Sequence, residues 1–156
     1  QVSSMLFNAV ARADLEIVSR SPHAWPSTYV NIGEDATVNW PNLDFVFRND
    51  RSTPIFIVAY YNNRKCTVEI YGASLGAGES RDLVSQVVDV TAPPAEPLME
   101  MNTALPYGTT KEKKKARTGY VVDTYKIYKR TGTEYKREKL CTSVYRVIQQ
   151  VIEYNY

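Results

Sequence analysis

Few side chains in this 156-residue chain have the chemistry of a nucleophile, a base or a metal ligand. There is one histidine, His23, and there are two cysteines, Cys66 and Cys141. No Cys-x-x-Cys or Cys/His spacing is present, so we expect no metal site and no cofactor. His23 lies in the stretch SPHAWP, where a lone histidine is more often structural or exposed than catalytic. The two cysteines either form one disulfide or, as we favour, are two free thiols on strands.

Charge is distributed unevenly along the chain. The net charge is only +2, which makes no case for nucleic-acid binding. Residues 1–92 hold 7 Lys and Arg against 10 Asp and Glu, whereas residues 93–156 hold 12 against 7. A basic second half favours an anionic partner, and the segment from Lys111 to Arg117 (KEKKKAR) is the candidate for contact with an anionic polymer. A solvated basic loop without a partner is the alternative. No apolar run approaches 18 residues, so we expect no membrane span.

The apolar pattern predicts one helix at the start of the chain. Ser3 and Ser4 are good N-cap residues, and Pro22 cannot continue a helix. We therefore expect a helix from about Ser4 to Arg20, with an apolar stripe along one face formed by Leu6, Val10, Ala13 and Ile17.

The rest of the chain reads as strands and turns. Alternation predicts strands at 28–32, 36–40, 43–49, 54–61, 66–72 and 83–91, and again at 120–130, 133–146 and 147–156. The continuous apolar run at 54–61 is typical of a central strand. The pairs at 63–64 and 131–132 predict hairpin turns, and residues 111–119 a basic loop.

These elements predict an α+β fold class, in which one N-terminal helix packs on an antiparallel sheet and a small elongated all-β module follows. The Pro-rich stretch APPAEP is the best boundary between the two units. We expect the first domain at residues 1–91, the linker at 92–97 and the second domain at 98–156.

The start of the chain resembles a known motif. QVSSMLFNAV is similar to the stretch that follows a Gly-x-Cys motif in the VanW family of bacterial cell-envelope proteins, and the matching positions are Gln1, Val2, Ser3, Ser4, Leu6, Asn8 and Ala9. Met5 departs from the family's usual Thr. The blocks GEDATV, TPIFIVAY and TVEIYG continue the resemblance to about residue 72.

The second unit resembles the G-five domain, a small all-β module of extracellular proteins proposed to bind cell-wall glycans. The residues that carry this resemblance are Gly108, Gly119, Tyr120, Thr124, Tyr125, Gly132, Arg137 and Glu138. Some of the family's glycines are missing here.

The VanW resemblance implies a chemistry. Some members of that family are L,D-transpeptidases, which cross-link peptidoglycan through a cysteine acyl-enzyme. The family's cysteine comes directly before the position of Gln1, so we expect the 156-residue chain alone to be inactive. A thiolate at a helix N-terminus is stabilised by the helix dipole, and the N–H groups of the first turn can hold an oxyanion. Those groups would come from Gln1, Val2, Ser3 and Ser4, although the two serines are equally explained as caps.

The resemblance also suggests partners for that thiol. His23 is the candidate base, and Asp35, in GEDATV, would orient it or bind an amine of the substrate. The simpler interpretation of Asp35 is a turn residue that caps its own backbone. Across the predicted helix, His23 lies about 25 Å from the nucleophile position, so the loop must fold back. Trp25 and Tyr29 are candidates for substrate contact, although aromatics of this kind are more often core residues.

Two functions remain open from the sequence. The first is part of a peptidoglycan L,D-transpeptidase that forms 3-3 cross-links, with stem peptides or glycan strands as partners. The second is a non-catalytic module that binds the cell wall. Both imply an extracellular, wall-associated protein, and the resemblance suggests a Gram-positive bacterium.

Overall fold

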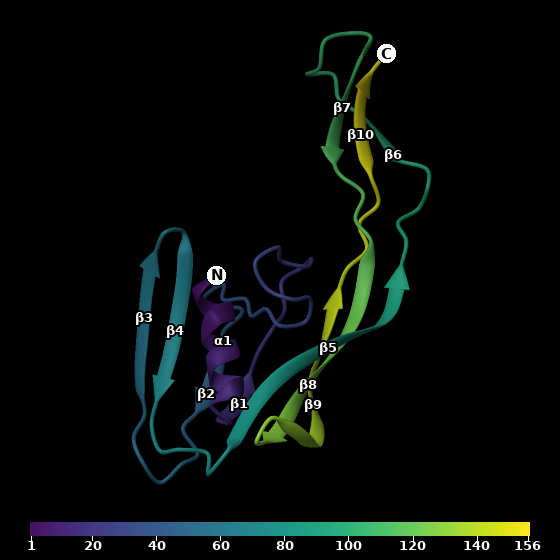
Figure 1. The fold of residues 1–156 in the computed structure, drawn as a ribbon. Helices are drawn as coiled ribbons and strands as arrows, with labels where there is room; N and C mark the ends of the chain where they lie inside the picture. Colours follow the sequence, from purple (N-terminus) through teal and green to yellow (C-terminus); the bar gives the residue numbers. More distant parts are fainter.

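The computed structural model describes residues 1–156 and has an α+β fold. Its one helix, α1 (Val2–Arg12), packs against strands β1, β4 and β5. The remaining elements are strands, and the second half of the chain extends from the helix as a long all-β arm (Figure 1). The predicted fold class, a helix on antiparallel strands followed by an elongated β module, is therefore confirmed. No helix is both long and apolar enough to cross a bilayer.

Helix α1 ends eight residues earlier than the sequence pattern suggested. Ala13 is the C-cap, and Asp14 adopts a left-handed conformation with φ of 59°. The N–H of Leu15 then donates to the carbonyl of Val10 at 3.2 Å, a six-residue closure typical of helix ends. The chain turns back as β1 (Glu16–Ser19), which pairs with β2 (Val46–Arg48). The prediction of a helix to Arg20 was wrong because apolar spacing does not reveal a left-handed turn.

Residues 20–45 form an irregular loop, and the strands predicted at 28–32 and 36–40 are absent. Few backbone bonds hold this loop; Thr37 N–H donates to the Ser21 carbonyl at 2.8 Å, and Glu34 N–H to the Asn31 carbonyl at 3.0 Å. Side-chain hydrogen bonds from the helix and from the arm hold the remainder, and these bonds build the candidate site.

Strands β3 (Phe56–Asn62) and β4 (Lys65–Tyr71) form a separate two-stranded sheet. Their turn places Asn63 and Arg64 at φ of 47° and 62°, as the predicted two-residue hairpin requires. The prediction that 54–61 is a central strand was wrong, because every residue of β3 is exposed and the strand lies at a sheet edge. A continuous apolar run does not specify how many neighbours a strand has.

The largest sheet has the order β5-β8-β9 and consists of β5 (Glu79–Thr91), β8 (Gly119–Arg130) and β9 (Thr133–Tyr145). Strand β5 lies before the predicted linker and pairs along its length with β8, which lies after it. One sheet thus joins residues from both sides of the predicted boundary at 92–97.

The far end of the arm is a second sheet, of order β6-β10-β7. It consists of β6 (Leu98–Met101), β7 (Thr109–Lys114) and β10 (Val151–Asn155). The basic loop predicted at 111–119 is wrong for its first half, which belongs to β7. The strand predicted at 147–156 is shorter than expected, since the chain crosses between the two sheets before Val151.

The main core lies between α1 and the segments that surround it. It is one buried cluster of apolar residues, formed by Phe7, Val10, Ala11, Leu15, Ala36, Phe45 and Leu83. Phe7 and Val10 are fully buried in this core, whereas the predicted Leu6, Ala13 and Ile17 are partly buried and pack against it. Cys66 and Cys141 are free thiols, as favoured from the sequence.

Candidate functional site

The start of α1 is tied to the loop that contains Asp35. Ser3 Oγ donates to the Ala36 carbonyl at 2.7 Å, and Ala36 N–H donates to Ser4 Oγ at 3.1 Å. Ser4 is fully buried. The two serines are therefore not N-caps; the N-cap is Gln1, which makes no side-chain capping bond. Their hydroxyls instead fix residues 35 and 36 beside the first turn of the helix.

His23 and Asp35 form the centre of the site. Asp35 Oδ2 accepts a hydrogen bond from the His23 ring Nδ1 at 2.6 Å and another from the His23 backbone N–H at 2.6 Å. Ser27 Oγ lies 3.4 Å from the same ring nitrogen. The loop thus brings together the predicted base and the predicted orienting carboxylate, and the carboxylate fixes both the backbone and the ring of His23.

Asp35 is buried but ionised. Burial alone raises the pKa of this carboxyl group, yet hydrogen bonds from His23 and Tyr145 and the charge of Arg20 outweigh burial and hold the pKa below its ordinary value of 3.8. Arg20 Nη2 lies 3.3 Å from Asp35 Oδ1, and the two side chains are only 3% and 1% exposed. A carboxylate accepts hydrogen bonds but cannot donate them, so the hydrogen between it and the ring resides on Nδ1 of His23.

The other ring nitrogen of His23 faces a short chain of hydroxyls. Tyr29 Oη lies 3.4 Å from His23 Nε2, and Ser4 Oγ lies 3.4 Å from Tyr29 Oη. Tyr29 Oη can donate to Nε2, and Ser4 Oγ can donate either to Tyr29 Oη or to the Ala36 carbonyl, which lies 3.2 Å away. With the Nδ1 hydrogen directed at Asp35, the neutral form of the ring has Nε2 as its acceptor, and Tyr29 links this nitrogen to Ser4 in the first turn of α1.

The N-terminus of α1 has the properties of an anion site. The N–H groups of the first turn have no acceptor within the helix, and no side chain caps them. Beside them lies an opening of about 200 Å³ lined by Gln1, Met5, Tyr29, Arg64, Lys65 and Cys66. Unpaired N–H groups, the helix dipole and two nearby cations all favour negative charge at this point.

The fold explains how His23 reaches the start of the helix. Because α1 ends at Arg12, β1 returns along the helix instead of continuing away from it, as Figure 1 shows. The separation of about 25 Å expected from a long helix therefore does not arise. Among the predicted site residues, the structure brings together Ser3, Ser4, His23, Tyr29 and Asp35, and it places Gln1 at the adjoining opening.

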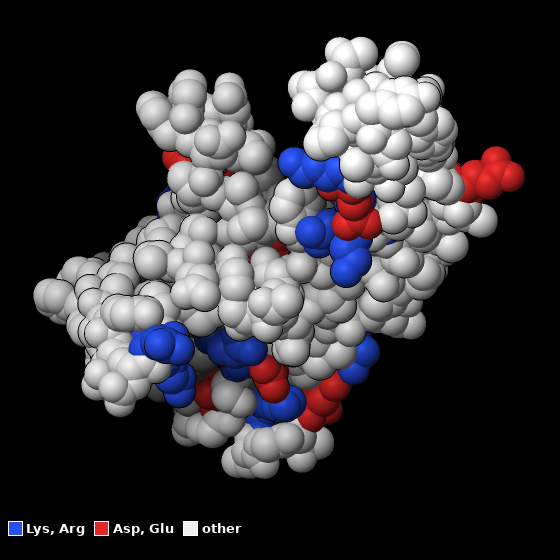
Figure 2. Space-filling model, turned by 90° about the horizontal axis from the view of Figure 1, so that it is seen from above, with Lys and Arg blue, Asp and Glu red and all other residues white.

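Trp25 lies apart from this cluster. Its ring is 45% exposed and stacks under the guanidinium of Arg117 at 4.7 Å, a cation–π contact between the loop and the arm. In the basic segment from Lys111 to Arg117, Lys113 is paired with Glu100 at 2.7 Å and with Glu153 at 3.1 Å. Figure 2 shows blue and red side chains intermixed on the face seen from above, so this face carries no large patch of one sign.

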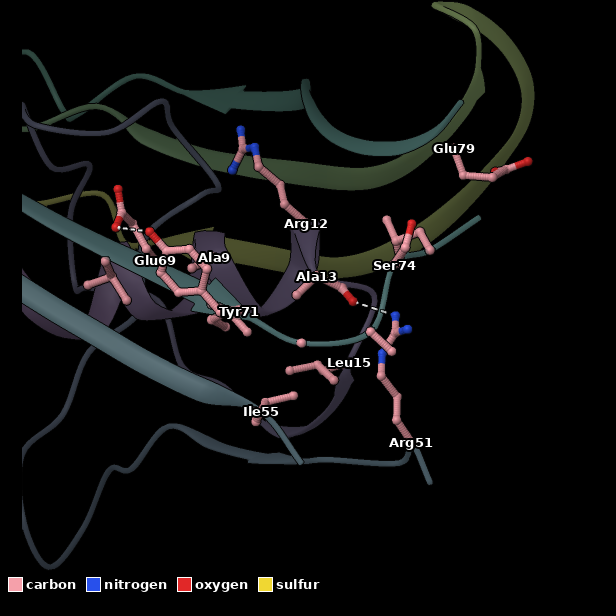
Figure 3. Close-up of a pocket in the computed structure, with 15 residues that line it drawn as sticks. Ala9, Arg12, Ala13, Leu15, Arg51, Ile55, Glu69, Tyr71, Ser74 and Glu79 are labelled. Atoms are coloured by element: carbon pink, nitrogen blue, oxygen red, sulfur yellow. Dashed lines mark hydrogen bonds between the residues drawn. The ribbon is translucent and has the colours of Figure 1, made fainter. Parts of the chain in front are cut away.

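A larger hollow than the opening beside Gln1 lies elsewhere. A cleft of about 630 Å³ is formed by the C-terminal half of α1, by β4 and by the loops around Arg51 and Ser74 (Figure 3). Arg51 Nη2 donates to the Ala13 carbonyl at 2.7 Å on its wall. None of the residues predicted for the site lines this cleft.

Sequence reasoning missed three groups that complete the site. Arg20 was placed at the end of the predicted helix, Gly33 between two predicted strands, and Tyr145 on a strand of the other unit. Gly33 N–H donates to Tyr145 Oη at 2.8 Å, and Tyr145 Oη in turn donates to Asp35 Oδ1. A positive φ at Gly33 was foreseeable from its turn, whereas no sequence signal links Tyr145 to a carboxylate 110 positions away.

The first part of the chain is similar to known proteins. Residues 1–71 match the family model described as "VanW like protein". A segment of 75 residues, 48% of this chain, is 44% identical to "Uncharacterized protein YoaR" of Bacillus subtilis (strain 168) and spans 25% of that protein's length. The VanW resemblance predicted for residues 1–72 is therefore confirmed.

Two solved G5 domains are also similar to about half of the chain. The first, "IgA1 Protease G5 domain structure", is 19% identical, and the match covers 50% of this chain and 92% of that chain with a TM-score of 0.31. The second, "Crystal structure of HP0197-G5", is 16% identical, and the match covers 48% of this chain and 97% of that chain with a TM-score of 0.24. They belong to the class that the second unit was predicted to resemble. At these TM-scores they do not define its fold.

Proposed function

From the VanW-like segment at residues 1–71, we propose that the chain is part of a cell-envelope enzyme that transfers acyl groups between peptidoglycan stem peptides. In this proposal the longer protein is an L,D-transpeptidase that forms 3-3 cross-links through a cysteine acyl-enzyme. It acts outside the cell, at the wall of a Gram-positive bacterium.

One observation carries the proposal. His23 is held by Asp35 at 2.6 Å on one ring nitrogen and is linked on the other, through Tyr29 and Ser4, to the first turn of α1. An oriented imidazole whose Nε2 can accept a proton lies next to helix N–H groups without an acceptor, so the site combines a base with an oxyanion site. In this proposal the nucleophile is a cysteine at the position before Gln1, where the VanW resemblance implies one.

The residues of this chain would then act in sequence. Nε2 of His23 takes the proton of a thiol at that position, directly or through Tyr29, and the thiolate attacks the carbonyl carbon of a stem peptide. The first-turn N–H groups of α1 hold the oxygen that becomes negative. The C–N bond breaks, His23 returns the proton to the departing amine, and an amine of a second stem peptide then displaces the thiol.

The test is a muropeptide cross-linking assay on the longer protein. Replacing the cysteine before Gln1 with Ala is expected to abolish cross-linking, and His23→Ala to slow it by roughly 10²- to 10⁴-fold, as the loss of a general base does. Asp35→Asn should also slow cross-linking, because it weakens the bond that orients His23, and Asp50→Asn at an exposed aspartate is its matched control. Unchanged cross-linking in the His23→Ala protein would refute the assignment of the base.

A second function, wall binding without catalysis, is favoured by one feature of the arm. Lys111, Lys114 and Lys115 are exposed and form no ion pair, in contrast to Lys113. Three unpaired lysines on one short segment attract an anionic wall polymer. In a sedimentation assay with isolated cell walls, the variant with these three lysines replaced by Gln should no longer sediment with the walls. Walls stripped of anionic polymer should likewise fail to retain the unmodified chain. Retention of the triple variant would argue against this surface.

A further inference from the structure

We propose that the site extends beyond the VanW-like segment, and that Tyr145 on β9 is a positioning residue that holds His23 in its working tautomer through Asp35. The inference rests on the proposed function for the role of His23. Neither the family match, which ends at residue 71, nor the predicted site contains any residue of β8 or β9.

The first support is the place of the Tyr145 hydroxyl. It accepts from Gly33 N–H at 2.8 Å and donates to Asp35 Oδ1, so it closes a bridge across the turn that carries the carboxylate. The side chain is 2% exposed. Burial, together with the neighbouring carboxylate of Asp35, raises the pKa of this hydroxyl, so that it remains protonated and keeps donating.

The second support is that the two oxygens of Asp35 have different hydrogen-bond partners. Oδ1 is occupied by Tyr145 and Arg20, while Oδ2 accepts both bonds from His23. Fixing Oδ1 stops the carboxylate from rotating, and Oδ2 therefore stays in line with Nδ1 of the ring. A group that fixes the orientation of a carboxylate in this way fixes the tautomer of the histidine bonded to it.

The third support is that other groups of the same hairpin hold the same turn. Arg20 Nη1 donates to Ser143 Oγ at 2.6 Å, and Thr124 Oγ1 donates to the Gly33 carbonyl at 2.9 Å. Thr124 and Ser143 are fully buried. Three buried hydroxyls from β8 and β9 therefore converge on residues 20, 33 and 35, and the arm forms the rear wall of the site.

The test uses the single histidine as a spectroscopic probe. In the 156-residue chain labelled with ¹⁵N-histidine, long-range ¹H–¹⁵N spectra report the tautomer of His23 directly. The unmodified chain should show one tautomer, with the hydrogen on Nδ1 and a downfield proton resonance for the bond to Asp35. Tyr145→Phe should lose the downfield resonance and show mixed tautomers.

Tyr135→Phe is the matched control. Tyr135 lies on the same strand and donates to a carboxylate, Glu79, at 2.7 Å, but it is exposed and remote from the site. Its spectrum should equal that of the unmodified chain. Identical histidine spectra for Tyr145→Phe and the unmodified chain would overturn the proposal.

A second variant covers the case in which Tyr145→Phe does not fold. Ser143→Ala removes the acceptor of Arg20 Nη1 and leaves Tyr145 in place. Because Tyr145 still donates to Asp35 Oδ1, the downfield resonance and the single tautomer should remain; their loss would show that Arg20 rather than Tyr145 fixes the carboxylate, and would overturn the proposal. The spectra require no catalysis; a failed cross-linking assay with the expected spectra would refute the enzyme and leave the positioning role intact.

Discussion

The junction between the loop and β8–β9 differs sharply from the distal sheet β6-β10-β7 in how each holds its charges. At the junction, Arg20 and Asp35 are 3% and 1% exposed and have several hydrogen-bond partners each. In the distal sheet, the ion pair between Lys113 and Glu100 lies in the open, and Val151 is the one buried residue of the three strands.

The difference shows that position, rather than number, decides what a charged group contributes. A buried charge that loses its partner is costly, because water cannot replace that partner. An exposed pair is screened and loses little when it is broken. The junction should therefore be sensitive to single atoms, while the distal sheet should tolerate changes of whole side chains.

The largest effect is expected for Asp35→Ala. It leaves the Arg20 guanidinium buried without its counter-charge, and we expect the free energy of unfolding to fall by roughly 3–5 kcal/mol in urea titrations. Glu134→Ala is the control, because Glu134 pairs with Arg137 at 3.0 Å and both side chains are exposed. A similar loss in both variants would remove the contrast between buried and exposed charge.

A smaller loss is expected for Gly33→Ala. The new Cβ would lie 2.7 Å from Thr124 Oγ1 and 2.8 Å from Val122 Cγ1, at a residue with φ of +89°. We expect a loss of roughly 1–3 kcal/mol from backbone strain and overpacking. Gly132→Ala separates the two causes, because Gly132 has φ of +84° and nothing within 4 Å. Equal losses by chemical denaturation would show that the contact with β8 adds nothing.

Acid should weaken the fold, and part of this loss should come from the junction. The pKa of Asp35 is lowered, and so is that of Asp14, which accepts hydrogen bonds from Lys126 and Arg81. A carboxyl group with a lowered folded pKa stabilises the fold above its ordinary value of 3.8, and this contribution is lost as the pH falls through the folded value. Thermal unfolding between pH 7 and pH 2 should show a drop that starts near pH 4, and Asp35→Asn should flatten it. An equally steep drop in Asp35→Asn would assign the acid sensitivity to other groups.

The smallest effect is expected in the distal sheet. Lys113→Gln breaks exposed pairs with Glu100 and Glu153, and the urea midpoint should not change beyond experimental error. A clear shift of the midpoint would mean that this sheet depends on its charges as the junction does.

Local signals in the sequence predicted local features well. The turn residues at 63–64 and 131–132 correctly predicted both hairpins, and the alternation of apolar and polar residues correctly predicted β4, β5, β8 and β9. The end of the helix was missed, since it depends on a left-handed Asp14 whose side chain is held by Arg81 and Lys126 from distant strands. Contacts that far apart in sequence leave no mark in a short window.

The candidate site was predictable in part for the same reason. His23 and Asp35 were identified through a family motif, and the structure places them in contact. Their supporting groups, Arg20 and Tyr145, were not identified, because their roles arise only when β9 packs behind the loop. The role of Ser4 was also different from the one expected, since a capping residue and a buried hydroxyl look alike in sequence.

The central position of β10 has a mechanical consequence. Strand β10 is parallel to β6 and antiparallel to β7, so it is bonded along both of its edges. Tension applied along this strand would load two ladders of hydrogen bonds in shear, and these bonds must break together rather than one after another. The chain also passes three times between the distal sheet and the β5-β8-β9 sheet (Figure 1). The arm is therefore suited to transmit a pulling force to the rear wall of the site without first peeling apart.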